Sequence, residues 1–490
     1  MLITCAILLP ILLGALIPLF HFKSVKARGW YVEAVVLATS ALVGAALLQP
    51  AGETVSLFRL YDGLTLTLHI DGMTRVFAGL VALLWPLASL YGFEYMKHEE
   101  RPDSFFTFYT MSYGVTLGIA AAGNLFSMYI FYECLTMMTL PLVYHKKDSA
   151  SFRAGRMYLY YSIGGAALGF IALMISLFYG ETSSFVFGGV FDPGKVQGMA
   201  TLLRAVYVLA FFGFGTKAAV FPLYAWLPTA SVAPTPVTAL LHAVAVVNAG
   251  AFAVLRVTYY VFGTGLLAGT WAQTVVLAFS CFTIVFASGM AVKEQHLKRR
   301  LAYSTVSNLS YMLMGCCLMT PAGMTASLAH LVIHGIIKIT LFYCAGAILV
   351  KTGQEYVQDI RGLAKVMPFT SAVFMLASVA LVGTPPLSGF VSKWNLLTAA
   401  SAVQTPMGIV AVASLIISAI LTAIYLMGVA LPMYFRPTSA PIALAEGKTA
   451  DPNWMMKLPF GLLCIVMVTL GLWSQPLISF LRSVAAGMLP

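Results

Sequence analysis

The chain has 490 residues, of which 60% are hydrophobic and only 9% are charged, and its mean hydropathy is +0.90. So little charge excludes a water-soluble domain. Its net charge of +11 would suggest nucleic-acid binding in a soluble protein, but here the basic residues lie in short segments between long apolar runs.

Apolar runs of 18 or more residues recur along the whole chain, and each can cross a hydrocarbon core of about 30 Å. Lipid offers the backbone no hydrogen-bond partner, so such runs are predicted to be helices, and the alternating pattern of a membrane barrel is absent. The chain is therefore predicted to be an all-α, polytopic membrane protein.

In chain order, about fourteen segments meet the usual span length of about 20 residues. They begin near Leu2, Trp30, Gly72, Ser104, Asn124, Gly155, Met199, Pro228, Trp271, Arg300, Met324, Pro368, Pro406 and Trp454. The first has no basic residues before it, so we expect a retained span rather than a signal peptide. Nineteen of the 28 basic residues follow odd-numbered spans, which predicts both termini on the outer side of the cell (inner) membrane.

Four ionisable residues lie deep inside predicted spans. Almost all of the seventeen acidic residues fall in loops or at span ends, but Glu133 is centred in an apolar run. Lys217, Lys338 and Lys393 are similarly deep. A charge at the middle of the bilayer costs at least about 2.5–3.5 kcal/mol, so such residues are rarely accidental. One acid and a few lysines could pair in the interior, and a purely structural ion pair between Glu133 and Lys217 is the alternative to a functional one.

Histidines extend this pattern. His330, His334 and Lys338 are spaced four residues apart, which places three titratable groups on one stripe of a single helix and favours a proton ladder. His242 lies near one end of another predicted span. Histidine titrates near neutrality and suits a relay, although a lone buried histidine is more often a hydrogen-bonded core residue than part of a relay. Metal binding by His330 and His334 is the less favoured alternative.

Two spans contain proline and glycine interruptions. One runs through Gly213, Lys217 and Pro222, and the other through Gly383, Pro386 and Lys393. Proline removes a backbone hydrogen bond, so both helices are predicted to be broken, at spans 7 and 12. Interrupted spans at matching places suggest two inverted five-helix repeats with ion sites at the breaks. The predicted organisation is 1–103 for the first three helices, 104–256 and 271–432 for the repeats, and 454–490 for a fourteenth helix.

Several motifs together identify a family resemblance. They are Phe131-Tyr132-Glu133, Gly215-Thr216-Lys217, Pro222 to Pro228, Pro234-Thr235-Pro236-Val237, Leu241-His242-Ala243, Lys298 to Thr305, and Pro385 to Phe390 with Lys393. From about residue 70 to 435 the chain resembles the antiporter-like subunits shared by respiratory complex I, Mrp Na⁺/H⁺ antiporters and membrane-bound [NiFe] hydrogenases. It departs from many relatives at Asn248 and at Arg156, where a lysine is common, and we expect no long lateral helix after the fourteenth span.

The resemblance implies a hydrated axis at mid-membrane. Glu133 would modulate Lys217, the gated proton carrier, and Lys393 would be the terminal lysine. His242, His330, His334 and Lys338 would form the central relay.

Two functions remain open from the sequence, and a third, a membrane scaffold with a degenerate relay, is disfavoured by the presence of Glu133, Lys217 and Lys393. The first is proton translocation within a multi-subunit complex, driven by electron transfer on partner subunits of a quinone oxidoreductase or membrane hydrogenase type. The second is a subunit of an Mrp-type Na⁺/H⁺ antiporter without a redox partner. The seven cysteines show no Cys-x-x-Cys spacing, so we expect no cofactor and no metal in this chain. Expected partners are other membrane subunits, including another antiporter-like or quinone- or hydrogenase-module subunit, together with lipid and H⁺ or Na⁺.

Overall fold

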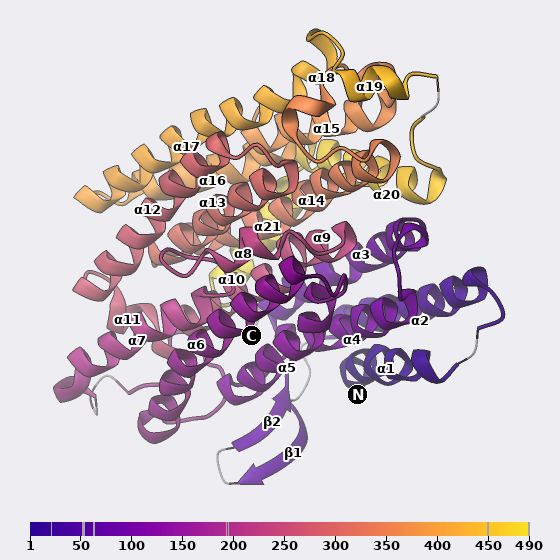
Figure 1. Cartoon of the computed structure of the whole chain (residues 1–490). Helices are drawn as coiled ribbons and strands as arrows, with labels where there is room; N and C mark the ends of the chain where they lie inside the picture. Colours follow the sequence, from indigo (N-terminus) through magenta and orange to yellow (C-terminus); the bar gives the residue numbers. More distant parts are fainter. Residues whose placement is uncertain are drawn as a thin grey trace.

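The computed structural model describes residues 1–20, 22–50, 54–61, 64–192, 194, 196–447 and 450–488. Lys195 and Lys448, which the charge pattern counted, lie outside the described residues. In the described part the chain forms a bundle of helices that run roughly side by side, with one small β-hairpin at its end (Figure 1).

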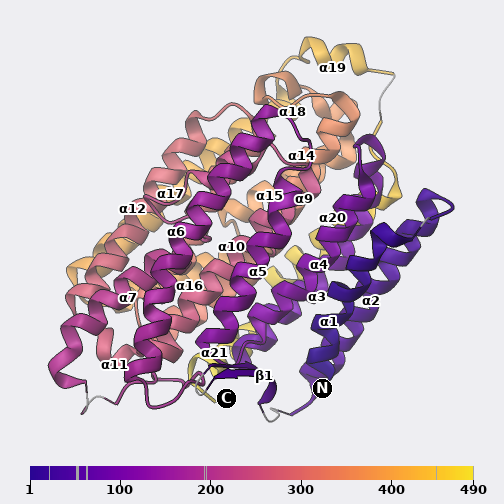
Figure 2. The same ribbon diagram turned by 60° about the horizontal axis from the view of Figure 1, so that its bottom comes forward.

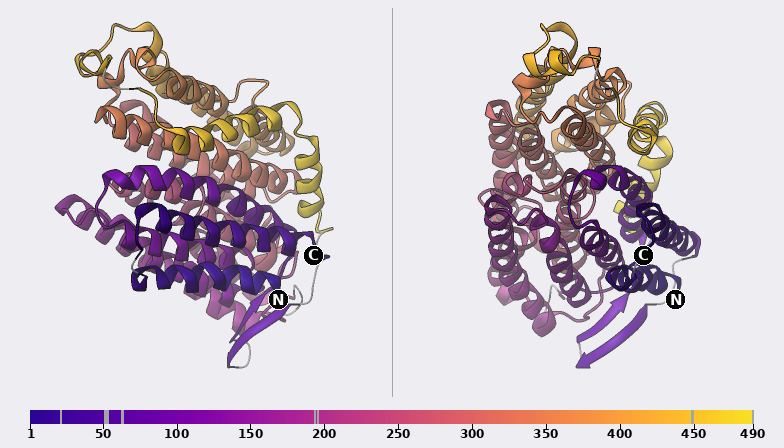
Figure 3. Two further views of the ribbon diagram at one scale, coloured as in Figure 1. Left: turned by 90° about the vertical axis from the view of Figure 1, so that its right-hand side faces the viewer. Right: turned by 45° about the vertical axis from the view of Figure 1, so that its right-hand side comes forward.

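The first part of the chain supplies six helices and the hairpin. Its elements are α1 (Leu2–Leu16), η1 (Ile17–Leu19), α2 (Val25–Leu48), β1 (Val55–Tyr61), β2 (Leu64–Leu68), α3 (Gly72–Tyr95), η2 (Met96–His98), α4 (Pro102–Ala120), α5 (Leu125–Val143) and α6 (Ser149–Tyr179). The antiparallel hairpin was not predicted, and it projects from the end of the bundle where the termini lie (Figure 3).

The middle part is the most interrupted. Its elements are η3 (Gln197–Met199), α7 (Ala200–Gly215), α8 (Trp226–Ala230), α9 (Thr235–Ala243), α10 (Val246–Arg256), the π-helical turn η4 (Val257–Phe262), α11 (Thr264–Leu267) and α12 (Trp271–Lys293). The predicted break in the seventh span is confirmed, because α7 stops at Gly215 and regular helix resumes only at Trp226.

The last part contains the longest helix. Its elements are α13 (Leu297–Cys317), α14 (Pro321–Thr352), η5 (Val357–Ile360), η6 (Leu363–Lys365), α15 (Pro368–Val382), α16 (Ser388–Ala402), α17 (Pro406–Ala430), α18 (Pro432–Phe435), α19 (Ala440–Ala445), α20 (Trp454–Leu472) and α21 (Gln475–Ala485). The second predicted break separates α15 from α16. The segment 454–490, expected as one helix, contains two in its described residues.

Within the described residues ten helices are long and apolar enough to cross a membrane, and α7 and α15 are shorter apolar helices. The all-α membrane class is thus confirmed, while the count of fourteen spans stays a prediction. Both termini lie at one end of the bundle, opposite α18 and α19 (Figure 2). We call the end that bears α18 and α19 the basic end, because it carries the exposed residues Lys23, Lys97, Lys147, Lys293 and Lys351.

Helix starts follow local capping chemistry. The side chains of Asp71, Asn124, Asp148 and Thr320 each accept a hydrogen bond from a backbone N–H in the first turn of the helix that follows. Such caps satisfy donors that a helix start otherwise leaves unpaired. These polar residues therefore fix where α3, α5, α6 and α14 begin.

Polarity is arranged in the opposite way from a soluble protein. Large apolar side chains such as Ile409, Ile420 and Phe178 are exposed on the outside, whereas all the histidines of α14 are buried. The helix α14 and the segment α9–α10–η4 form the centre of the bundle. In the most apolar stretch of α14 94% of the residues are buried, and in that of α9–α10–η4 100% are buried. A predicted relay on α14 therefore lies in the middle of the molecule.

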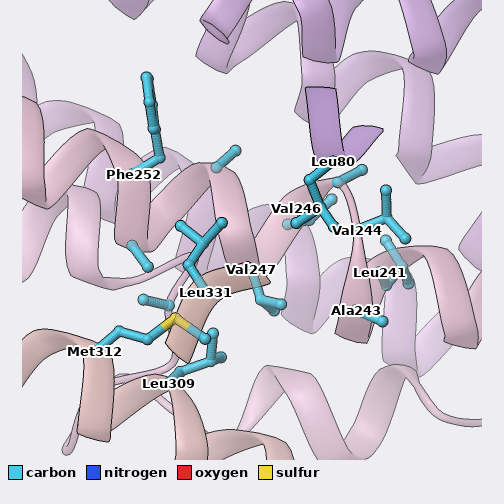
Figure 4. Packing of buried hydrophobic residues seen from close by; sticks show 14 of the residues in the cluster. Leu80, Leu241, Ala243, Val244, Val246, Val247, Phe252, Leu309, Met312 and Leu331 are labelled. Carbon is cyan, nitrogen blue, oxygen red and sulfur yellow. The ribbon is translucent and has the colours of Figure 1, made fainter. Parts of the chain in front are cut away.

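A third break was not predicted. The eighth span was expected to be continuous, but α9 ends at Ala243 and α10 starts at Val246. Figure 4 shows the apolar side chains around this interruption: Leu241, Ala243, Val244 and Val246 with Leu80 beside them, and Val247 near Leu331, Leu309 and Met312. No proline or glycine lies between Ala243 and Val246, so the break carries no sign of this kind in the sequence.

Candidate functional site

The break after α7 places Lys217 inside the bundle. The indole Nε1 of Trp226 donates to the carbonyl oxygen of Thr216 at 2.8 Å, which satisfies one backbone group that the interruption leaves free. The helix α10 passes close by, because a Cβ on Gly250 would lie 2.9 Å from Cβ of Lys217. Only glycine allows this approach, which holds the lysine backbone in place.

Lys217 and Glu133 are brought together as predicted. The Nζ of Lys217 lies 4.0 Å from Oε1 of Glu133, and the side chains are 1% and 23% exposed. Lys217 Nζ also donates to the carbonyl oxygen of Tyr132 and lies 3.4 Å from the centre of the Tyr132 ring. Glu133 Oε1 has no hydrogen-bond partner among the described residues. The pair is in contact but not locked by a direct hydrogen bond.

The second break positions Lys393. Gly383, after α15, adopts a φ of +96°, and a Cβ there would lie 2.9 Å from Cδ of Lys393. The Nζ of Lys393 donates to the carbonyl oxygen of Val382 at 3.1 Å and therefore caps the broken end of α15. Lys393, Gly383 and Tyr311 line a cavity of about 160 Å³. The terminal lysine thus faces a small cavity at an interrupted helix.

The stripe on α14 is buried along its length. His330 Nδ1 is 3.0 Å from Ser392 Oγ, and the rings of His330 and His334 are 5.9 Å apart. Lys338 Nζ donates to the carbonyl oxygen of Leu301 at 2.9 Å. Neither ring nitrogen of His334 has a protein partner among the described residues. No third His, Cys, Asp or Glu of those residues joins the two histidines in a metal-sized cluster.

His242 lies at the third break, next to this stripe. Its Nε2 is 3.5 Å from Ser231 Oγ, and its ring packs on Phe342 of α14 at 4.8 Å. Asn248 Nδ2 donates to the carbonyl oxygen of Ala243 at 2.8 Å, so this side chain supports the broken end of α9. Asn248 therefore serves the backbone at this break.

The predicted residues form two groups rather than one continuous chain. His242, His334 and Lys338 lie within range of one another's charge, and Lys393 lies within range of His330 and Lys338. Glu133 and Lys217 form the other group. Asn248 lies between the groups, on a helix that packs against both α7 and α14. Arg156, the other departure from many relatives, is exposed.

A buried ion pair that the sequence did not predict lies near the end of the bundle opposite the basic end. Arg256 binds both carboxylate oxygens of Asp71, with a 2.7 Å bond from Nη2 to Oδ1, and the side chains are 2% and 6% exposed. The sequence places both at predicted span ends, where charge is ordinary. Their separation of 185 residues left no local pattern to join them.

The depth of Glu33 was not predicted either, because this residue lies near the start of a predicted span. The structure places this acid well inside α2, where it accepts a 2.5 Å hydrogen bond from Ser89 of α3. Lys298 was treated as a loop charge, but it is 3% exposed in the first turn of α13. The signal for Lys298 was present, because it opens the motif that supports the family resemblance.

A membrane bundle with deep lysines at helix breaks defines an antiporter-like membrane subunit. Residues 122–420 match the model of the NADH:quinone oxidoreductase/Mrp antiporter transmembrane family, and the chain belongs to this family. NADH-quinone oxidoreductase subunit N of Desulforudis audaxviator is 32% identical over 82% of this chain and 80% of its own length. The resemblance stated from the sequence is confirmed.

Other relatives are longer. A probable K⁺/H⁺ antiporter subunit of Rhizobium meliloti is 34% identical over 68% of this chain, and an Na⁺/H⁺ antiporter subunit of Staphylococcus haemolyticus is 29% identical over 96%. This chain spans only 32% and 60% of their lengths.

Two solved structures share the fold. A chain of the archaeal membrane-bound sulfane sulfur reductase has a TM-score of 0.85 at 21% identity, with 99% of this chain and 97% of that chain covered. A chain of the Mrp complex from Dietzia sp. has a TM-score of 0.86 at 24% identity, with 100% and 52% covered. Both of those structures are of membrane complexes, and the likeness shows that this chain has the same fold.

Proposed function

We propose that this chain translocates protons through its buried ionisable residues, as one subunit of a membrane complex whose partners carry out electron transfer. The observation that supports this most is the contact of Glu133 with Lys217 beside a helix break. A buried lysine is strongly sensitive to the charge next to it. Because Glu133 is near Lys217 but not hydrogen-bonded to it, a small movement of the Glu133 carboxylate can change the charge beside the lysine.

In this mechanism Glu133 holds a proton on Lys217 while the two are close. When Glu133 moves away or becomes protonated, the Lys217 ammonium loses its stabilising charge and releases a proton toward Asn248 and His242. Lys338, His334 and His330 then pass protons from His242 to Lys393, with water at the ring nitrogens that lack a protein partner. Lys393, at the cavity beside the second break, releases them.

The arrangement of charge supports one orientation. Exposed lysines gather at the basic end, so by the positive-inside rule this end faces the cytoplasm and both termini face outward in the inner membrane. In this proposal the energy for transport comes from a quinone- or hydrogenase-type module on partner subunits. Partners are expected to include a second antiporter-like subunit.

Similarity to a named Na⁺/H⁺ antiporter protein over 96% of this chain supports a second candidate, an Mrp-type subunit without a redox partner. The two candidates differ in what drives transport. An electron donor added to the intact complex should start proton uptake under the first proposal. Under the second, uptake should require an imposed sodium gradient.

The test is proton uptake by proteoliposomes that contain the intact complex. We expect Lys217→Ala and Glu133→Ala each to abolish pumping without loss of assembly, because they remove charge rather than packing. Lys351→Ala, which removes an exposed lysine at the end of α14, is the matched control and should pump normally. Unchanged pumping in Lys217→Ala would make the ion pair structural and would leave this chain the role of a scaffold.

A further inference from the structure

A second lysine–glutamate pair has the same construction as Glu133–Lys217. Lys298 Nζ lies 4.0 Å from Oε1 of Glu355, the same separation as in the first pair. Again the lysine is buried and the acid is partly exposed, with side chains 4% and 36% exposed. Again the lysine donates to a backbone carbonyl, here that of Ala233 at 3.3 Å.

The position of this pair is fixed by the backbone. Glu355 follows α14, and Lys298 is in the first turn of α13. The N–H of Leu297 donates to the carbonyl of Glu355 at 2.8 Å, and the N–H of Val357 donates to that of Gln295 at 3.0 Å. His296 Nε2 lies 3.5 Å from Oε2 of Glu355. The acid is therefore held at the basic end with one oxygen toward His296 and the other toward the buried lysine.

On its buried side, the Lys298–Glu355 pair lies toward His242. Ala233, which accepts from Lys298, is two residues from Ser231, and Ser231 Oγ is 3.5 Å from His242 Nε2. Ser231 and His242 are both buried. From Glu355 at the surface, ionisable and hydroxyl groups thus continue inward to the relay.

We propose that Lys298 and Glu355 form a second gated proton carrier, which admits protons from the basic end directly to His242. This rests on the proposed function. A proton leaves the Lys298 ammonium for the Ser231 hydroxyl, through water where they do not touch, and Ser231 passes its own proton to His242 Nε2. The neutral Lys298 amine then takes a proton from a hydronium ion beside Glu355. Proton and charge balance, and no electron moves.

This entry supplies His242 from the basic end, and transport requires both this entry and the step through Lys217. It also assigns a role to a charged residue buried at a helix start, where an exposed lysine would serve membrane orientation equally well.

The experiment measures proton uptake in proteoliposomes of the intact complex with Lys298→Met, Lys298→Arg and Glu355→Gln. We expect Lys298→Met to reduce uptake by about tenfold or more, Glu355→Gln to reduce it less, and Lys298→Arg to retain a charge but not transport, since arginine does not release its proton. Arg299→Gln, on the same turn but exposed, is the matched control and should be normal.

The outcomes separate this inference from the proposed function. Normal uptake in Lys298→Met together with loss of uptake in Lys217→Ala would overturn the proton entry through Lys298 and leave the proposed function standing. Normal uptake in both would overturn both. If Lys298→Met does not assemble, Glu355→Gln decides, because it keeps the backbone contacts of residue 355. Normal uptake in that variant, or full activity in Lys298→Arg, would exclude a gated carrier.

Discussion

Two buried ion pairs of this bundle are built in opposite ways. Arg256 reaches both oxygens of Asp71, Thr74 adds two bonds to the same carboxylate, and the guanidinium lies 4.7 Å from the ring centre of Tyr260. Glu133 and Lys217 instead meet at 4.0 Å, with one acid oxygen unpartnered among the described residues.

The difference indicates which pair can switch. Removing one partner from a closed, buried pair leaves an uncompensated charge, so a closed pair resists change. A pair held at contact distance loses little when it opens. Burial of charge alone therefore does not identify a functional site. The geometry of each pair does distinguish them. We call the closed Arg256–Asp71 pair the clamp, and the Glu133–Lys217 pair, which can open, the switch.

The largest effect on stability is expected for the clamp. Arg256→Met should destabilise the protein by about 3–5 kcal/mol, because Asp71 keeps its charge without a partner. Heat unfolding of the purified complex, compared with Arg299→Met at an exposed site, measures this. Asp71→Leu combined with Arg256→Met should recover part of the loss. A loss no larger than that of the control would contradict the assignment.

The switch should show the reverse pattern. Glu133→Gln preserves shape, and Oε1 of Glu133 accepts no hydrogen bond from the described residues, so stability should change by less than about 1 kcal/mol. Transport should fall about tenfold, as typical for the loss of one coupling interaction. Uptake and heat unfolding measured on the same preparation test both parts. A large loss of stability with normal uptake would make this pair a clamp as well.

The histidines of α14 should differ among themselves by a smaller factor. His334 has no protein partner on either nitrogen among the described residues, whereas His330 keeps Ser392 at 3.0 Å. Glutamine can replace a hydrogen bond but cannot transfer a proton. Both substitutions should slow uptake, and His334→Gln should slow it more than His330→Gln. The order of the two rates, measured at equal assembly, is the result that matters.

The sequence revealed those parts of the site that local rules determine. The breaks at Lys217 and Lys393 were predictable from proline and glycine, and the α14 stripe from four-residue spacing. Glu133 was evident because it interrupts an apolar run. In each case the chemistry that sets the structure lies within one helix.

The remainder depends on contacts between distant segments. The break beside His242 is held by packing of α9 and α10 against other helices, and Asn248 was its one local sign. Arg256 and Asp71 each looked like ordinary charges at span ends. Lys298 contacts both Ala233 and Glu355, which are far from it in the sequence, and no local pattern of α13 indicates these contacts.

The pair at the basic end supplies the smallest prediction, and its sign follows from the pKa of Glu355. A hydrogen bond from His296, with the charges of Lys298 and Lys146, lowers that pKa from 4.5 to about 2 against the effect of burial. A depressed pKa means that the ionised acid stabilises the fold at neutral pH, and that this contribution is lost as pH falls from about 4.5 through about 2. Glu355→Gln should therefore flatten the fall of the unfolding temperature in this window, while Glu446→Gln, at an exposed acid, should leave it unchanged. Because the Glu355 side chain is 36% exposed, the difference should be small and should shrink with added salt. A large, salt-independent difference would mean that Glu355 is locked like Asp71, and a locked acid could not open to let Lys298 release its proton.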